Sequence, residues 1–103
     1  MESVKRYQRF GDFYPFYLSE HSNIICRRLH FIGSLLSIVV LLYALMTQVF
    51  TLLWLVPVIG YGFAWVGHFF FEKNRPATFS YPLYSFMGDW VMFKDILFKK
   101  IPI

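Results

Sequence analysis

The sequence predicts an all-α membrane protein, a two-span transmembrane helical hairpin with flanking amphipathic interfacial helices. The first supporting observation is composition: 57% of the 103 residues are hydrophobic, 16% are charged and the mean hydropathy is +0.49. Soluble domains average about 45–50% apolar and about 25% charged residues. The second observation is that residues 29–71 contain no Asp, Glu, Lys or Arg. Because one span needs only about 20 apolar residues, this block is long enough for two spans joined by a tight turn.

The composition also excludes other classes of protein. So apolar a chain is neither a disordered tail nor a low-complexity segment. Cys26 is the only cysteine, which rules out an intrachain disulfide, and we interpret it as a small residue on a helix face. The N-terminal MESVKRYQRFGDF lacks the apolar segment of a signal peptide, so the hydrophobic block is expected to remain in the mature protein. We treat residues 1–103 as a single integral membrane domain.

The first element expected is a short interfacial helix over residues 12–21, DFYPFYLSEH. Its aromatic side chains Phe13, Phe16 and Tyr17 recur at helical spacing, and Pro15 is tolerated in a first turn. Aromatic rings of this kind favour the level of the lipid head groups. The sequence therefore places this helix on the membrane surface.

The first span is expected over residues 24–50, with Ser22 and Asn23 available as N-cap residues. The segment TQVFT, residues 47–51, is the natural turn because it is the polar interruption of the block, although it lacks Gly and Pro.

The second span is expected over residues 52–71, with a kink at Pro57. It must end before Pro76, because proline disfavours helical geometry in the residue before it. Small residues on both spans would let the two helices approach closely; they are Gly33, Ser37, Gly60, Ala64 and Gly67. Gly60 and Ala64 are equally a candidate seam for a homodimer.

The last element expected is an amphipathic helix over residues 79–98. This segment is rich in aromatic residues but is interrupted by Asp89, Lys94 and Asp95. Charges at the centre of a bilayer are costly, so the pattern favours a helix on the membrane surface over a third span.

The basic residues predict the orientation of the hairpin. Those before the first span and after the second are Lys5, Arg6, Arg9, Arg27, Arg28, Lys73, Arg75, Lys94, Lys99 and Lys100, and the turn between the spans has none. The positive-inside rule then puts both termini in the cytoplasm. The membrane would be the inner membrane in a bacterium or the endoplasmic reticulum in a eukaryote. The basic residues face this membrane, and no nucleic-acid-binding pattern is present.

Two histidines are expected to meet at the cytoplasmic end of the hairpin. His30 lies at the start of the first span and His68 near the end of the second, so antiparallel packing brings them to one level. Glu72 follows His68 by four residues and shares its helix face. His21 and His30 would face opposite ways on one continuous helix, but a break at residues 22–23 lets His21 join them.

These residue types predict a metal site. Imidazoles with a carboxylate and without a thiolate pair suit iron(II), zinc or manganese. Two histidines on facing helices could instead hold a b-type haem. Asn23, Asn74 and Asp89 are candidates for orienting the imidazoles. A third interpretation is a non-catalytic membrane interaction protein in which the His/Glu cluster is a structural hydrogen-bond network.

Two stretches, FYPFYLSEHSNIICRRLHFIG and GYGFAWVGHFFFEKNRPATFSYPLYSFMGDWVMF, carry a family resemblance. Their combination of H-x8-H with G-H-x3-E-x-N-R-P-A resembles the short bacterial branch of the yeast-type 2-hydroxy fatty acid dioxygenase family. The resemblance implies an integral membrane enzyme that depends on Fe(II). It would convert a 2-hydroxy fatty acid and O2 to the acid one carbon shorter, in lipid α-oxidation.

Carried over by position, the resemblance implies that His21, His30 and His68 bind the iron. Glu72 matches the acidic residue of the motif and is the candidate catalytic residue, either as a further iron ligand or as a group behind the ligands. Three arginines at the interface could hold the substrate carboxylate, because arginine pairs with carboxylates in a bidentate manner; they are Arg27, Arg28 and Arg75. The acyl chain would lie along the apolar hairpin among the membrane lipids.

Overall fold

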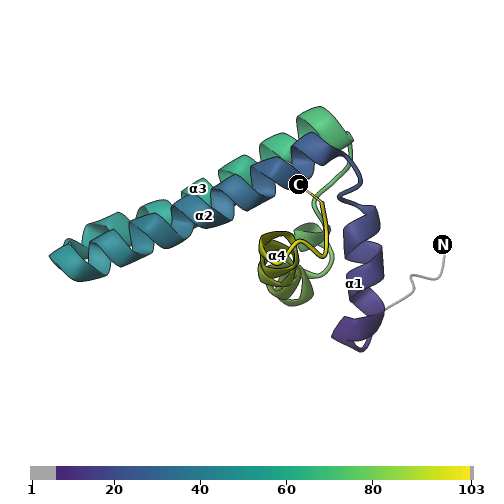
Figure 1. Cartoon of the computed structure of the whole chain (residues 1–103), viewed down its shortest axis with the longest axis horizontal. Coiled ribbons are helices and arrows are strands. Elements are labelled where there is room, and N and C mark those ends of the chain that lie inside the picture. Colours follow the sequence, from purple (N-terminus) through teal and green to yellow (C-terminus); the bar gives the residue numbers. More distant parts are fainter. Residues whose placement is uncertain (1–6, 103) are drawn as a thin grey trace.

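The computed structural model describes residues 7–102, which form helices and turns and contain no strand. The helical elements in chain order are α1 (Phe10–Ser19), α2 (Ile24–Thr47), η1 (Phe50–Trp54), α3 (Leu55–Val66), η2 (Gly67–Glu72), η3 (Ala77–Phe79) and α4 (Pro82–Leu97). In Figure 1, α2 and α3 lie side by side as a long rod, and α1 and α4 lie across one end of it. The predicted all-helical hairpin with two flanking helices is confirmed. Lys5 and Arg6, counted in the orientation, lie outside the described residues.

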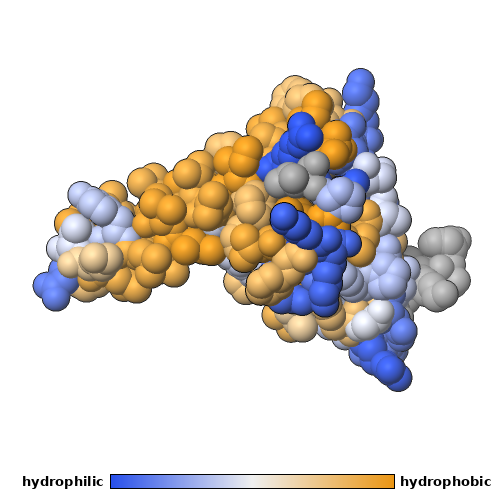
Figure 2. All heavy atoms as spheres, in the orientation of Figure 1, coloured by the Kyte–Doolittle hydropathy of each residue, from blue (hydrophilic) through white to orange (hydrophobic). Residues whose placement is uncertain are grey.

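Both arms of the hairpin are long and apolar enough to cross a membrane. The first is α2, and the second is the continuous rod Phe50–Glu72 formed by η1, α3 and η2. Only 22% and 11% of their most apolar windows are buried inside the chain, so most of this apolar surface faces outward. Figure 2 shows an apolar shaft with polar residues at its tip and a mixed base. This distribution is what a membrane-crossing hairpin requires.

The turn between the arms lies where the polar interruption predicts it. Helix α2 ends at Thr47, and Gln48 takes a left-handed conformation with φ 61°. Glycine usually occupies this position because it lacks a Cβ. The second arm begins at Phe50 as a 3-10 turn and becomes α-helical at Leu55. Pro57 therefore lies in the first α-helical turn, where its missing N–H is tolerated, and the change of helix type precedes it.

Small residues let the two arms pack at close range, as the sequence predicts. A Cβ on Gly67 would lie 2.9 Å from the Cys26 Sγ atom, and a Cβ on Gly33 would lie 2.8 Å from the Phe63 Cβ. The Ser37 hydroxyl donates to the Val56 carbonyl at 3.3 Å. The small residues thus contribute to packing between the two arms of the same chain.

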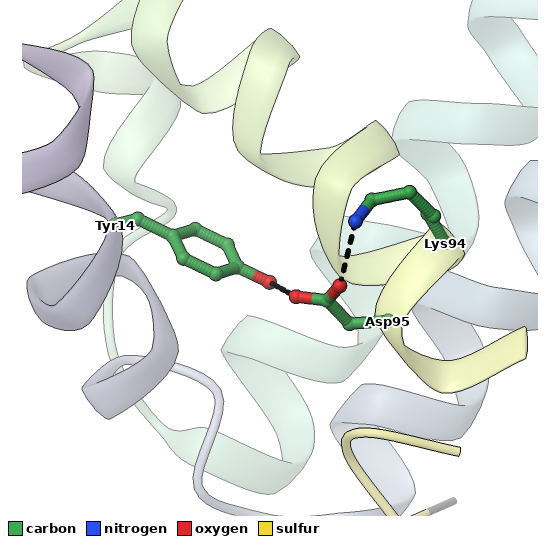
Figure 3. A network of polar contacts seen from close by, with 3 residues as sticks. All are labelled: Tyr14, Lys94 and Asp95. Atoms are coloured by element: carbon green, nitrogen blue, oxygen red, sulfur yellow. Dashed lines mark hydrogen bonds and ion pairs between the residues drawn. The ribbon is translucent and has the colours of Figure 1, made fainter. Parts of the chain in front are cut away.

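Helices α1 and α4 pack on each other beside the base of the hairpin. Phe13 and Tyr17 of α1 and Met92 of α4 are almost fully buried in this contact. The Tyr14 hydroxyl donates to the Asp95 carboxylate at 2.8 Å, and Lys94 pairs with the same carboxylate (Figure 3).

The flanking helices differ slightly from their predicted bounds. Helix α1 begins at Phe10 rather than residue 12, so Pro15 lies in its second turn and not its first. Helix α4 begins at Pro82, after the short turn η3. It is seen end-on in Figure 1 while the hairpin runs across the view, so its axis lies roughly perpendicular to the two arms.

Candidate metal site and apolar cavity

Three imidazoles converge at the base of the hairpin. The His21 Nε2 atom lies 3.1 Å from the His30 Nε2 atom and 3.0 Å from the His68 Nε2 atom. The three side chains are buried, with 1%, 6% and 2% of their surface exposed. Residues 47 positions apart in the chain are thus brought into one cluster.

The Nδ1 atom of each imidazole faces an oxygen atom that can only accept a hydrogen bond, so each Nδ1–H group donates to it. The His21 Nδ1 atom lies 2.6 Å from the Tyr17 carbonyl oxygen, and the His30 Nδ1 atom lies 3.0 Å from the Cys26 carbonyl oxygen. The His68 Nδ1 atom lies 2.7 Å from the Asn74 amide oxygen. These partners assign the proton to Nδ1 in all three rings. The three Nε2 lone pairs therefore face one another.

His21 and His68 each lie just after the end of an α-helix. Helix α1 ends before His21, and α3 ends before His68. Helix α1 ends at Ser19, and the turn before Ile24 folds His21 back onto the Tyr17 carbonyl, which also accepts the Glu20 backbone N–H. His68 lies in the π-helical turn η2, a feature common at functional sites. Lys73 then takes φ 61°, which returns the chain so that the Asn74 backbone N–H reaches the His68 carbonyl oxygen.

The spacing of the three nitrogens fits one metal ion. Metal–imidazole bonds are about 2.0–2.1 Å long, so two nitrogens on one ion at a right angle lie about 3.0 Å apart. Burial lowers the pKa of His21 well below its usual value, and the neighbouring His30 and His68 lower it further. A neutral ring is the form that binds a metal. The small cavity beside the rings is about 10 Å³ in volume.

Cys26 belongs to the same group of possible ligands, and the sequence analysis missed it. The ligand atoms of His21, Cys26, His30 and His68 all lie within 4.8 Å of one another. The Cys26 Sγ atom lies 3.8 Å from the His30 Nδ1 atom, however, which is the nitrogen that points away from the other two imidazoles. The i, i+4 spacing of Cys26 and His30 on one helix is the signal that could have revealed it.

Glu72 lies outside this group of ligand atoms. Its carboxylate accepts a hydrogen bond from the Asn23 backbone N–H and another from the Ser22 hydroxyl at 3.3 Å. Asn23 is the N-cap of α2, because its side-chain oxygen accepts from the N–H groups of Ile25 and Cys26. Glu72 and Asn23 thus join the end of the second arm to the start of the first.

Asp89 contacts the histidines through Tyr17. The Tyr17 hydroxyl donates to the Asp89 Oδ1 atom, and the Tyr17 ring stacks on His21 with 4.1 Å between ring centroids. Burial raises the pKa of Asp89 to about 6, although the hydrogen bond from Tyr17 acts in the opposite direction. Asp89 also lines the small cavity beside the histidines.

An apolar cavity of about 150 Å³ opens between the hairpin and α4. His30 and Asp89 line it together with the hydroxyl groups of Ser34, Ser37 and Tyr61, and Phe86, Trp90 and Pro57 are among the side chains that give it an apolar wall. The cavity therefore extends from the histidine cluster along the second arm. A mainly apolar lining with a few polar groups is typical of a ligand site.

The three arginines occupy different surroundings, and none of them lines either of these two cavities. Arg27 is partly buried, donates to the Pro102 carbonyl at 3.2 Å and lines an open groove together with His21. Arg28 is exposed. The Arg75 guanidinium lies 5.4 Å from the centre of the Phe79 ring.

Comparison with known proteins agrees with the sequence resemblance. A family model described as 2-hydroxy-palmitic acid dioxygenase Mpo1-like matches residues 7–101. Searches of curated proteins and of solved structures gave no significant match. The matched segment includes every residue of the histidine cluster and of both cavities. The chain therefore belongs to the 2-hydroxy-palmitic acid dioxygenase Mpo1-like family.

Proposed function

We propose that the chain is a membrane-embedded dioxygenase of 2-hydroxy fatty acids, and that His21, His30 and His68 bind one Fe(II) through their Nε2 atoms. One observation carries the metal proposal. All three Nδ1 atoms face an acceptor oxygen, so the Nε2 lone pair of His21 lies 3.1 Å from that of His30 and 3.0 Å from that of His68 in a buried place. Without a cation these lone pairs would repel one another, and a metal ion turns the repulsion into binding.

The family description supports a dioxygenase and the substrate class. Three neutral imidazoles suit iron(II) and leave coordination positions open; when bound, iron would supply the activation of O2. The reaction balances with one O2 and no further reductant. The bond between C1 and C2 breaks, C2 is oxidised to the carboxyl group of the shorter acid, C1 leaves as CO2, and one water forms.

The other predicted residues are proposed to act around this centre. Asn74 orients His68, and Glu72 positions the two arms that carry His30 and His68. Arg27 is the arginine we propose for attracting the substrate carboxylate, because its groove also borders His21.

The hairpin is proposed to span the membrane with both termini in the cytoplasm and the histidines at the cytoplasmic interface. The substrate's polar end resides at this depth, and its acyl chain would enter the apolar cavity from the lipid. Gly60 and Ala64, the candidate dimer seam, face the interior of the chain, so a homodimer would have to use other surfaces of the hairpin.

The decisive test is metal content and turnover of detergent-purified protein that is kept anaerobic and free of chelators. We expect about one iron per chain in the wild type, as the single three-imidazole cluster implies, and loss of that iron in His30→Ala and His68→Ala. With O2 and 2-hydroxyhexadecanoic acid, the wild type should form pentadecanoic acid, detected by mass spectrometry. Gln48→Ala, at the far end of the hairpin, is the matched control and should behave as the wild type.

Other outcomes would redirect the assignment. A folded protein that binds no metal would favour a structural His/Glu network in a membrane interaction protein. A Soret band would favour haem, although a cavity of about 10 Å³ beside the three rings favours a single ion. Stoichiometric zinc with no turnover would contradict the dioxygenase proposal while retaining the site.

A further inference from the structure

Ser85 carries a buried hydroxyl group without a hydrogen-bond partner among the described residues. The side chain is 1% exposed and lines the small cavity beside the three histidines. A serine inside a helix often donates to the carbonyl four residues earlier, but the Ser85 hydroxyl does not bond the Tyr81 carbonyl, which accepts the Ser85 backbone N–H at 2.8 Å. Buried polar groups are nearly always satisfied, so this hydroxyl is available to a bound molecule.

Asp89 follows Ser85 by one helical turn and lies on the same face of α4. Its Oδ1 atom accepts from Tyr17, and its Oδ2 atom accepts no hydrogen bond from the described residues. Asp89 lines both the small cavity beside the histidines and the larger apolar cavity, as His30, Tyr61 and Ala64 also do. The two cavities therefore meet at Asp89.

The meeting point of the two cavities at Asp89 indicates which part of an acyl substrate would lie beside this residue. A fatty acid whose chain fills the apolar cavity and whose head reaches the histidines would pass Asp89, which lines both cavities, and bring its first carbons to the small cavity that Ser85 also lines. The pair offers one acceptor and one donor, and a hydroxyl group can satisfy both. A methylene group at the same place would leave both unpaired.

We propose that Ser85 and Asp89 bind the 2-hydroxyl group of the substrate and thereby distinguish 2-hydroxy fatty acids from unsubstituted ones. The Ser85 hydroxyl donates to the substrate oxygen, and that substrate hydroxyl donates to the Asp89 Oδ2 atom. The inference rests on the proposed function, because it takes a fatty acid as the ligand of the apolar cavity. Sites built to bind a hydroxyl group reject analogues that lack it far more strongly than apolar pockets reject a missing methylene.

The test is a binding measurement on anaerobic, iron-loaded protein, in which no turnover occurs. Trp90 lines the apolar cavity, so its fluorescence reports occupancy during titration with 2-hydroxyhexadecanoic acid or hexadecanoic acid. We expect the wild type to prefer the hydroxylated acid. Ser85→Ala and Asp89→Asn should each reduce that preference by roughly tenfold, the effect of losing one hydrogen bond, and leave the affinity for hexadecanoic acid unchanged.

Phe86→Leu is the matched control, because Phe86 lines the apolar cavity beside Ser85 without a polar group. It should weaken both acids alike and keep the preference. A wild-type preference that survives in Ser85→Ala would overturn the inference, as would a wild type without any preference. Ser85→Ala preserves the Tyr17–Asp89 hydrogen bond, so it decides the question if Asp89→Asn does not fold. Iron content measured on the same samples separates this inference from the proposed function: normal iron with an unchanged preference contradicts the inference alone.

Discussion

The Asn74 amide oxygen lies 2.7 Å from the His68 Nδ1 atom, while the Asn74 amide nitrogen donates to the backbone carbonyl and the carboxylate of Glu20, each at 3.2 Å. The two donated bonds fix which way the amide points. One side chain thus selects the tautomer of His68 and joins the end of the second arm to the end of α1.

Replacing Asn74 with Ala should therefore weaken metal binding without removing a ligand. Loss of a partner that orients a metal-binding histidine typically costs about 10–100-fold in affinity. Competition with a chelator of known affinity measures this change. Gln48→Ala, at the far end of the hairpin, is the control and should keep the wild-type affinity. Wild-type affinity in Asn74→Ala would show that His68 is oriented by its other contacts.

Gly67 is a position beside the histidines where the two arms of the hairpin closely approach each other. An added Cβ would lie 2.9 Å from Cys26 Sγ and 3.1 Å from Cys26 Cα, so Gly67→Ala must push η2 away from α2 and move the adjacent His68. We expect a loss of about 1–3 kcal/mol in stability together with weaker metal binding. Thermal unfolding in detergent measures the first effect.

Gly62→Ala is the control for this prediction, because nothing lies within 4 Å of an added Cβ there. It should leave stability equal or raise it by up to about 1 kcal/mol, since alanine favours a helix over glycine. If the two variants were equally stable, the close approach of Gly67 and Cys26 would have no energetic role.

The ionisation of Asp89 should make stability depend on pH. Burial raises the pKa of this carboxyl group from 3.8 to about 6 in the folded protein, so the folded state holds a proton that the unfolded chain has already released. The contribution of the protonated Asp89 to stability is complete at pH values below its pKa of 3.8 in the unfolded chain. It is lost as the pH rises through the pKa of about 6 in the folded protein. The wild type should thus lose stability relative to Asp89→Asn over this interval. Melting temperatures of both proteins across it test the sign, and a difference that does not change with pH would contradict it.

Much of the architecture follows from one-dimensional patterns. The uncharged block of residues 29–71 requires a hairpin, and an antiparallel hairpin necessarily brings His30 and His68 to one level. The N-cap at Asn23 and the turn after Thr47 were predictable because capping and turn formation depend on neighbouring residues alone. The turn lacks the Gly or Pro that is usual there, and Gln48 adopts the left-handed conformation itself.

The direction of each side chain was not predictable in the same way. Glu72 shares a helical repeat with His68, yet η2 winds as a π-helix, so the usual four-residue rule does not describe their relation. The carboxylate is instead held by the Asn23 N–H at the start of α2. Cys26 was interpreted as a packing residue, and it does pack on Gly67, but its place in one group with His21 and His68 depends on how separate segments of the chain dock.

The sequence by itself therefore determined the helical hairpin, the level of the three histidines and the family, because hydropathy, charge and motif spacing are properties of the linear chain. Tertiary structure alone decided that Asp89 and Ser85, rather than Glu72, line the cavity beside the imidazoles. Helix α4 reaches the histidines only through its packing on Tyr17 and the base of the hairpin. Contacts between segments separated by some 70 residues depend on how whole helices dock, which no local pattern encodes.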